Sequence, residues 1–112
     1  MICKFWYTRN MKKYQKEIDE WVKGFEEPYW PALSQFAHLA EEVGEVGRIL
    51  NHMYGSKPKK SNEEKQELGE EIADVMFTLI CMANSHGIDL DIEIEKVIAK
   101  SKSRDKDRFA KK

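Results

Sequence analysis

Apolar side chains recur at helical spacing over most of the chain. The first such stretch predicts a helix from about Met11 to Lys23, closed by Gly24 in a left-handed conformation. The second predicts a helix that starts near Pro31 and ends at Gly55. The apolar residues along one side are Tyr14, Ile18, Trp21, Val22 and Phe25 in the first stretch, and Phe36, Leu39, Val43, Val46, Leu50 and Met53 in the second.

A third helix is predicted after a polar connection. Ser61 followed by Glu64 has the capping-box pattern of a helix start, and the apolar periodicity continues to about His86, where Gly87 closes the helix. Residues 72–83 of this helix are apolar nearly all round, which predicts burial on every side. One small bundle cannot cover so much apolar surface, so we expect a homo-oligomer.

The segment after Gly87 fits two patterns. Apolar residues alternate with acids from Ile88 to Ile94, as in a strand, but the apolar positions also fit a helix that continues to Ile98. A lone strand would have no partner and Asp89 is a favourable N-cap, so we expect a helix. Four helices with short connections predict an all-α fold, arranged as an antiparallel four-helix bundle.

Composition limits the class of protein. The chain has 112 residues, enough for one small domain, with 41% hydrophobic and 35% charged residues. No apolar run approaches the roughly 20 residues needed to span a bilayer, and residues 1–10 lack the apolar stretch of a secretory signal. Cys3 and Cys81 lie in unrelated contexts, which favours reduced thiols and a cytoplasmic protein.

Charge is divided unevenly along the chain. The formal net charge is only -1, which argues against binding nucleic acid by bulk charge. Residues 1–95 carry 11 basic and 18 acidic side chains, whereas residues 96–112 carry 8 basic and 2 acidic ones. The basic end is either a solubilising tail or a segment that meets an anion. The division is compatible with a site in which acids bind a cation and bases bind a phosphate.

Carboxylates gather on single faces of two predicted helices. At about 100° per residue, Glu41, Glu42 and Glu45 fall within one narrow arc of the second helix. The third helix places Glu67, Glu70, Glu71 and Asp74 within a similar arc. No Lys or Arg lies between positions 65 and 96 to pair with Asp74, and an unpaired buried carboxylate costs several kcal/mol. A bound metal ion would remove that cost.

The chemical type of these ligands indicates which metal ion they would bind. Glu42 with Glu45, and Glu71 with Asp74, form two i, i+3 pairs that offer only oxygen. Such ligands suit Mg²⁺ or Mn²⁺, whereas Zn²⁺ favours His or Cys. Because Mg²⁺ in proteins is commonly completed by phosphate oxygens, the pattern points to phosphate-ester or phosphoanhydride chemistry.

These residues carry a resemblance to a known family. Glu41-Glu42-x-x-Glu45, followed after 25 residues by Glu71-x-x-Asp74, resembles the EExxE and ExxD signature of the MazG family of all-α nucleoside triphosphate pyrophosphohydrolases. The resemblance extends over residues 11–109. It divides the chain into an N-terminal extension (1–10), a MazG-like helical domain (11–109) and the end of the basic tail (110–112).

The resemblance implies Mg²⁺-dependent hydrolysis of an NTP or dNTP to the monophosphate and pyrophosphate, a reaction compatible with nucleotide-pool house-cleaning. Assembly as a homodimer or homotetramer is implied as well. The implied Mg²⁺ ligands are Glu42, Glu45, Glu71 and Asp74. Glu41 would be a further ligand, a supporting group or the base for water. Lys100 and Arg104 resemble a basic pair that meets substrate phosphates.

Two further residues are candidate substrate contacts. His38 lies one helical turn before Glu42 on the acidic face, and Asn84 could meet a base or sugar.

Two other functions remain open from the sequence. A carboxylate-bridged di-iron bundle usually needs Glu-x-x-His pairs, which neither Glu45 nor Glu71 begins. The second alternative function is a non-enzymatic helical module that binds a metal or a partner.

Overall fold

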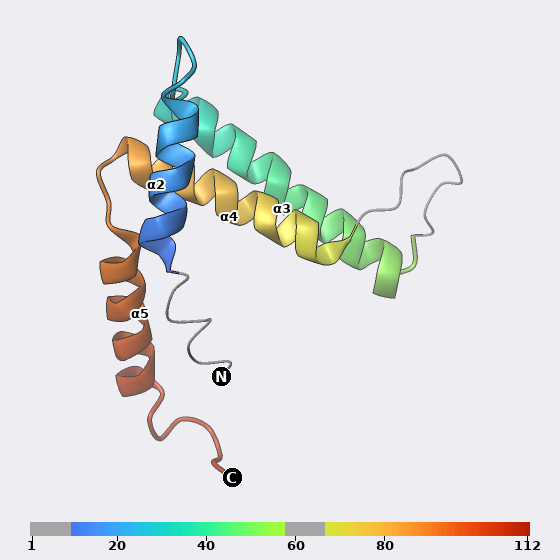
Figure 1. The fold of residues 1–112 in the computed structure, drawn as a ribbon. Coiled ribbons are helices and arrows are strands. Elements are labelled where there is room, and N and C mark those ends of the chain that lie inside the picture. The colour runs from blue at the N-terminus through green and yellow to red at the C-terminus, as the bar shows by residue number, and fades with distance from the viewer. Residues whose placement is uncertain (1–9, 58–66) are drawn as a thin grey trace, which may run out of the picture.

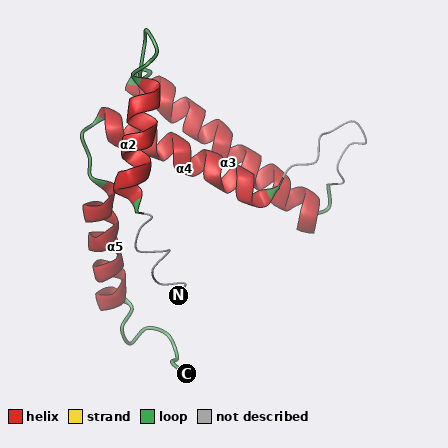
Figure 2. Cartoon of the chain, viewed as in Figure 1, coloured by secondary structure: helices red, strands yellow, loops and turns green. Residues whose placement is uncertain are grey.

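The computed structural model describes residues 10–57 and 67–112. Its helices are α2 (Met11–Val22), α3 (Ala32–Tyr54), α4 (Leu68–Ser85) and α5 (Leu90–Arg104). The described residues contain no strand, and the ambiguous segment after Ile88 is helical from Leu90 onward. The predicted all-α class is therefore confirmed (Figure 2). No helix in this part of the chain has the length and apolar character needed to cross a bilayer.

Two long antiparallel helices, α3 and α4, lie side by side and form the body of the molecule (Figure 1). α2 crosses this pair near the N-terminus of α3 and the C-terminus of α4, and it packs on α4. α5 packs mainly against α2 and runs away from the α3–α4 pair. Within one chain, α5 therefore does not cover the long helices.

A buried glutamine joins three of the helices. The Nε2 group of Gln15 in α2 donates to Oδ1 of Asn84 at 3.0 Å and to the carbonyl of Ile88 at 2.7 Å. Its Oε1 accepts from the N–H of Leu90 at 2.9 Å, and Nδ2 of Asn84 donates to the Gln15 carbonyl at 3.0 Å. These bonds satisfy backbone groups between α4 and α5 that would otherwise lack partners. They also fix the point at which α5 begins.

The start of α2 is capped from its own chain and from α5. Oδ1 of Asn10 accepts from the N–H of Lys13 at 3.0 Å. The carboxylate of Asp91 accepts from the N–H groups of Met11 and Lys12, each at 3.1 Å. A negative charge at a helix N-terminus also interacts favourably with the helix dipole. Asp91 thus ties α5 to α2.

The prediction that Gly24 closes the first helix in a left-handed conformation is wrong. Gly24 is not left-handed, because among the described residues only Gly87 has a positive φ, at +66°. The Gly24 N–H instead donates to the Trp21 carbonyl at 3.1 Å, in a tight turn that satisfies a terminal carbonyl without a left-handed residue. The prediction that Gly87 closes the third helix is correct, since α4 ends two residues before it.

The start of α4 lies later than predicted. Glu67 has an extended backbone, with φ -97° and ψ 136°, and the helix begins at Leu68. Glu67 makes no side-chain cap bond to this helix. The predicted capping box of Ser61 and Glu64 lies outside the described residues.

Little apolar surface is buried within the single chain. The buried apolar residues of the described part are Val22, Ile49, Ile80 and Ala83. Residues of α4 that were predicted to be buried are 40–45% exposed, namely Ile72, Met76, Phe77 and Leu79. That prediction is wrong for one chain alone, because α2 and α3 cover only part of α4. Apolar exposure on this scale is typical of a protein–protein interface and supports the expected homo-oligomer.

Candidate active site

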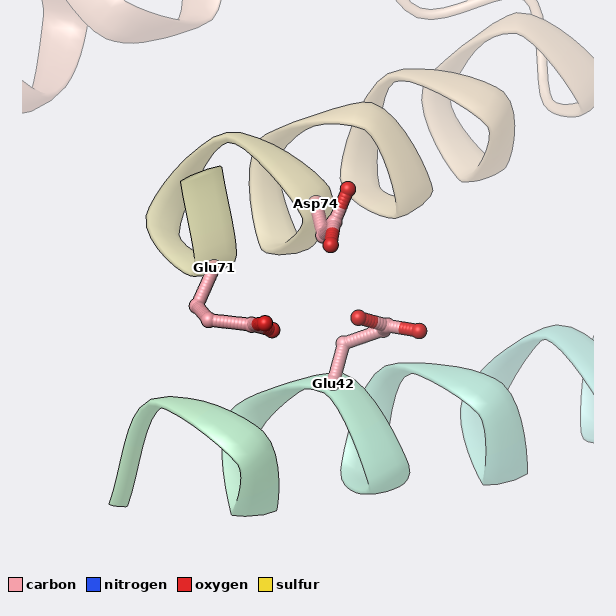
Figure 3. Close-up of side chains that lie close together, drawn as sticks. All are labelled: Glu42, Glu71 and Asp74. Carbon is pink, nitrogen blue, oxygen red and sulfur yellow. The ribbon is translucent and has the colours of Figure 1, made fainter. Parts of the chain in front are cut away.

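Three carboxylates converge between α3 and α4. Glu42 projects from α3, and Glu71 and Asp74 project from α4 (Figure 3). Each offers one oxygen, and these oxygens all lie within 4.8 Å of one another. Glu71 and Asp74 are three residues apart, so both leave the same face of α4 toward Glu42. This acid trio contains three of the four predicted metal ligands.

Glu71 is the buried member of the acid trio. It is 3% exposed, whereas the side chain of Glu42 is 19% exposed and Asp74 lies at the surface. Desolvation raises the pKa of Glu71, and the negative charges of Asp74, Glu45, Glu42 and Glu70 raise it further. No Lys or Arg of the described residues forms an ion pair with the trio. The charged form of Glu71 therefore needs a bound cation for compensation.

The acid trio fits a hard divalent cation. Its donors are all carboxylate oxygens, which Mg²⁺ and Mn²⁺ favour, and it contains no His or Cys. Three side chains leave coordination positions for water and for phosphate oxygens. The arrangement can therefore hold a metal ion and a phosphorylated substrate together.

The fourth predicted ligand, Glu45, lies at the edge of the trio. Its Oε2 accepts from Nε of Arg48 at 3.0 Å and lies 2.9 Å from Nη2 of the same side chain. This pairing draws the Glu45 carboxylate toward the next turn of α3 rather than toward Asp74. Its charge is nevertheless close enough to raise the pKa of Glu71.

His38 contacts two neighbouring carboxylates. Its Nε2 lies 3.6 Å from Oε1 of Glu42, and its Nδ1 lies 3.7 Å from Oε2 of Glu41. The Glu41 side chain is 76% exposed, so it is available to water. The ring of His38 also meets the ring of Trp30 edge-to-face, with centroids 5.4 Å apart. His38 thus connects the acidic site with an aromatic region.

That aromatic region is a cavity of about 420 Å³ between the start of α3, the end of α2 and α4. Its ring-bearing lining residues are Trp21, Phe25, Tyr29, Trp30, His38 and Phe77. Helical spacing predicted that Trp21 and Phe25 lie on the packing face of a helix, and it did not predict the cavity. The available signal was the density of aromatic residues, four of which fall within positions 21–30.

Two hydrogen bonds order the segment that carries these rings. The hydroxyl of Tyr29 donates to Asp19, and Nε2 of the buried Gln35 donates to the carbonyl of Trp30 at 2.7 Å. Burial and the bond to Asp19 raise the pKa of Tyr29 to about 12, so the phenol stays protonated at neutral pH. The same bond lowers the pKa of Asp19 and keeps it ionised. The cavity wall is therefore held in place by its own chain.

The three other predicted substrate contacts lie away from the acid trio, although the side chain of Asn84 also interacts with Tyr29 of the cavity wall. Asn84 uses both ends of its amide to hold Gln15. Lys100 and Arg104 are on α5, which runs away from the α3–α4 pair (Figure 1). Arg104 forms an ion pair with Asp105 at 2.9 Å. One chain therefore does not bring the predicted basic pair to the acid trio.

Comparison with known proteins agrees with this geometry. Residues 32–109 match the MazG nucleotide pyrophosphohydrolase domain. YpjD of Bacillus subtilis (strain 168) is 44% identical over 104 residues, which cover 93% of this chain and 94% of that protein. The crystal structure of YpjD aligns with a TM-score of 0.73 at 43% identity, covering 82% of this chain and 94% of that one.

A second crystal structure, that of a Bacillus-conserved MazG protein described as a nucleotide pyrophosphohydrolase, aligns with a TM-score of 0.69 at 41% identity. It covers 82% of this chain and 88% of that one. The matched domain spans both helices of the acid trio and most of the chain. The chain therefore belongs to the MazG family of nucleotide pyrophosphohydrolases.

Proposed function

We propose that this chain hydrolyses a nucleoside triphosphate or deoxynucleoside triphosphate to the monophosphate and pyrophosphate, with Mg²⁺ as cofactor and Mn²⁺ as a substitute. The observation that carries the proposal is the buried Glu71, which faces Glu42 and Asp74 and has no basic partner among the described residues. Burying a carboxylate among carboxylates is unfavourable unless a cation joins them. A metal-bridged phosphate substrate accounts for this arrangement.

The acid trio would hold the metal, and Glu45 would join it by exchanging its bond to Arg48 for a metal bond. Bound Mg²⁺ would polarise the phosphate oxygens and lower the pKa of a bound water. Glu41 is exposed and adjacent to Glu42 in the chain, which suits it to accept the proton of the attacking water. The water oxygen forms a bond to the α-phosphorus, and the bond from that phosphorus to the oxygen bridging to the β-phosphate breaks. Pyrophosphate leaves.

The aromatic cavity is the proposed site of the nucleobase. Its volume of about 420 Å³ is within the range of small-ligand sites, and its rings offer stacking surfaces. His38 lies between this cavity and Glu42, where the sugar and the α-phosphate of a bound nucleotide would pass. Lys100 and Arg104 do not reach the acid trio of their own chain, so their proposed role, neutralising the leaving pyrophosphate, requires a second copy in the expected homo-oligomer.

Pyrophosphate release from a panel of NTPs and dNTPs, with and without Mg²⁺, tests the proposal. Glu71→Gln and Asp74→Asn should each lower kcat at least about 100-fold while the helical circular dichroism remains, because each removes a charge that binds the metal. Glu20→Gln is the matched control, since it makes the same change on an exposed side chain of α2. Full Mg²⁺-dependent release by Asp74→Asn would show that the acids are structural.

The same assay separates the other candidate functions. A di-iron protein would bind iron and show no Mg²⁺-dependent release, and a binding module would show no turnover with any metal.

Trp30→Ala tests the base cavity. The KM for the preferred nucleotide should rise about tenfold or more, which is the order expected when one stacking contact is lost. Inorganic triphosphate has no base, so its hydrolysis should not change. Equal effects on both substrates would place the base elsewhere.

A further inference from the structure

The polar side chains of the aromatic cavity have their hydrogens and lone pairs unequally committed. The aromatic rings offer any base a stacking surface, so they do not discriminate strongly between bases. Polar groups discriminate, because a buried donor or acceptor that meets no complementary group on the ligand is costly. The lining residues with a polar side-chain group other than the indoles are Glu27, Tyr29, Gln35, His38, Thr78 and Cys81.

The hydroxyl of Thr78, on the α4 side of the cavity, is available only as an acceptor. Thr78 is buried, and its Oγ1 donates its single hydrogen to the carbonyl of Asp74 at 3.0 Å. No described residue donates a hydrogen bond to this oxygen. Donating to a ligand would require breaking the bond to Asp74, whereas accepting from a ligand would not.

Gln35, at the start of α3, is in the same condition. Its Nε2 group donates to the Trp30 carbonyl at 2.7 Å and to Oγ of Ser85 at 3.3 Å, which commits both amide hydrogens. Oγ of Ser85 lies 2.9 Å from the Met82 carbonyl and 3.4 Å from Oε1 of Gln35. Because the shorter contact takes the single hydroxyl hydrogen, Oε1 of the buried Gln35 keeps its acceptor capacity.

Two side chains from the segment between α2 and α3 add no hydrogen. The phenol of Tyr29 donates to Asp19, and its raised pKa of about 12 keeps that hydrogen in place at neutral pH. Glu27 is exposed and forms no ion pair with any described residue, so its carboxylate offers acceptor oxygens only. The polar lining of α3, α4 and this segment therefore consists of acceptors.

The donors among the described lining side chains are exposed, weak or directed elsewhere. Trp21 and Trp30 are 60% and 58% exposed, so their indole N–H groups can bond to water whether or not a ligand is present. The ring nitrogens of His38 face Glu41 and Glu42 at 3.7 and 3.6 Å. The thiol of Cys81 stays protonated because burial raises its pKa, and an S–H group is a weak donor.

We infer that the cavity selects cytosine and adenine over uracil and hypoxanthine. Cytosine and adenine carry an amino group, with two N–H donors, at the ring position where uracil and hypoxanthine carry an oxygen. The amino group can bond to the acceptors of the cavity, whereas the oxygen would face their lone pairs and leave buried groups without partners. The inference rests on the proposed function and names its substrate class, the nucleotides with an amino-bearing base rather than their deaminated forms.

Matched pairs of nucleotides test this inference. CTP and UTP differ in the group at one ring position and the neighbouring ring proton, and so do ATP and ITP. The kcat/KM for pyrophosphate release should be at least about tenfold higher for CTP than for UTP, and for ATP than for ITP. Taking the ratio within each pair cancels any difference in metal content or in the fraction of active protein.

Two variants test the assigned acceptors by the change in these ratios. Thr78→Val keeps the approximate shape of the side chain and removes the acceptor, so the ratio of CTP to UTP should fall about fivefold, as expected for one hydrogen bond. Glu27→Gln adds an amide donor that can bond to the uracil oxygen, and the ratio should fall about threefold. Glu26→Gln is the matched control, because Glu26 is exposed and does not line the cavity, and its ratio should equal that of wild type.

Ratios near one in both pairs, or higher kcat/KM for UTP and ITP, would overturn the inference. So would wild-type ratios in both Thr78→Val and Glu27→Gln. If the wild-type protein released no pyrophosphate from any nucleotide, the proposed function would fail instead. Quenching of tryptophan fluorescence by CMP and UMP would then test the cavity alone, because Trp21 and Trp30 line it. CMP should bind at least about tenfold more tightly, and equal binding, or none, would overturn the assignment.

Discussion

Gln15 offers a direct test of how the helices are held together. Gln15→Leu preserves the approximate volume of a side chain that is 9% exposed and removes its three side-chain hydrogen bonds. Oδ1 of Asn84, the Ile88 carbonyl and the Leu90 N–H each lose a partner. At about 1 kcal/mol for each bond, the loss is about 3 kcal/mol. The added apolar burial offsets about 1 kcal/mol of this, so the free energy of unfolding should fall by about 2 kcal/mol.

The measurement is urea and thermal unfolding followed by circular dichroism, at one fixed protomer concentration because association contributes to stability. A loss of about 2 kcal/mol should lower Tm by about 8 °C for a chain of this size. Lys16→Leu is the matched control, because Lys16 is the next residue on α2 and only its exposed pair with Glu20, at 3.9 Å, is lost. If Gln15→Leu unfolded within about 0.5 kcal/mol of wild type, the buried network would not be what fixes α5.

Three further changes test other parts of the fold. Gly87→Ala should cost about 1 kcal/mol because φ is +66°, whereas Gly69→Ala, inside α4 with open space around it, should be neutral or stabilising in the same unfolding assay. The raised pKa of Glu71 means that the metal-free folded state binds a proton more readily than the unfolded chain does. The stability that Glu71 contributes should therefore be fully present below the ordinary pKa of a glutamate and be lost as the pH rises through the raised pKa of Glu71. Glu71→Gln should flatten this part of a urea-midpoint profile. Tyr29→Phe removes the bond to Asp19 and should raise KM more than it lowers kcat, and an unchanged KM would separate this bond from the cavity.

The helices themselves could be predicted from the sequence because their determinants are local. Apolar spacing, the N-cap at Asp89 and the closing Gly87 act within a few residues, and each has the predicted role. The i, i+3 spacing of Glu71 and Asp74 likewise places both acids on one face of any helix that contains them. The family and the carboxylate chemistry follow from this local pattern.

The tertiary structure decided which of these groups meet. Glu42 and Glu71 are far apart in the chain, and only the side-by-side packing of α3 and α4 brings their oxygens together, while Glu45 turns to Arg48. The aromatic cavity depends on how α2 crosses the pair, which residue spacing does not encode. Asn84 shows the same limit, since its amide binds Gln15 across two helices.

The direction of α5 is the clearest case of a feature that the sequence left open. Periodicity predicts that residues 90–104 are helical, but it does not specify which neighbour receives the apolar face. Hydrogen bonds from the Leu90 N–H to Gln15 and from the Met11 N–H to Asp91 join α5 to α2 across 75 and 80 positions of the sequence. With these contacts, α5 runs away from the α3–α4 pair (Figure 1). Local interactions determine the helices, whereas packing between residues distant in sequence determines the site. The spacing of apolar residues does not specify which helices pack together, because the hydrophobic effect that drives packing is not directional.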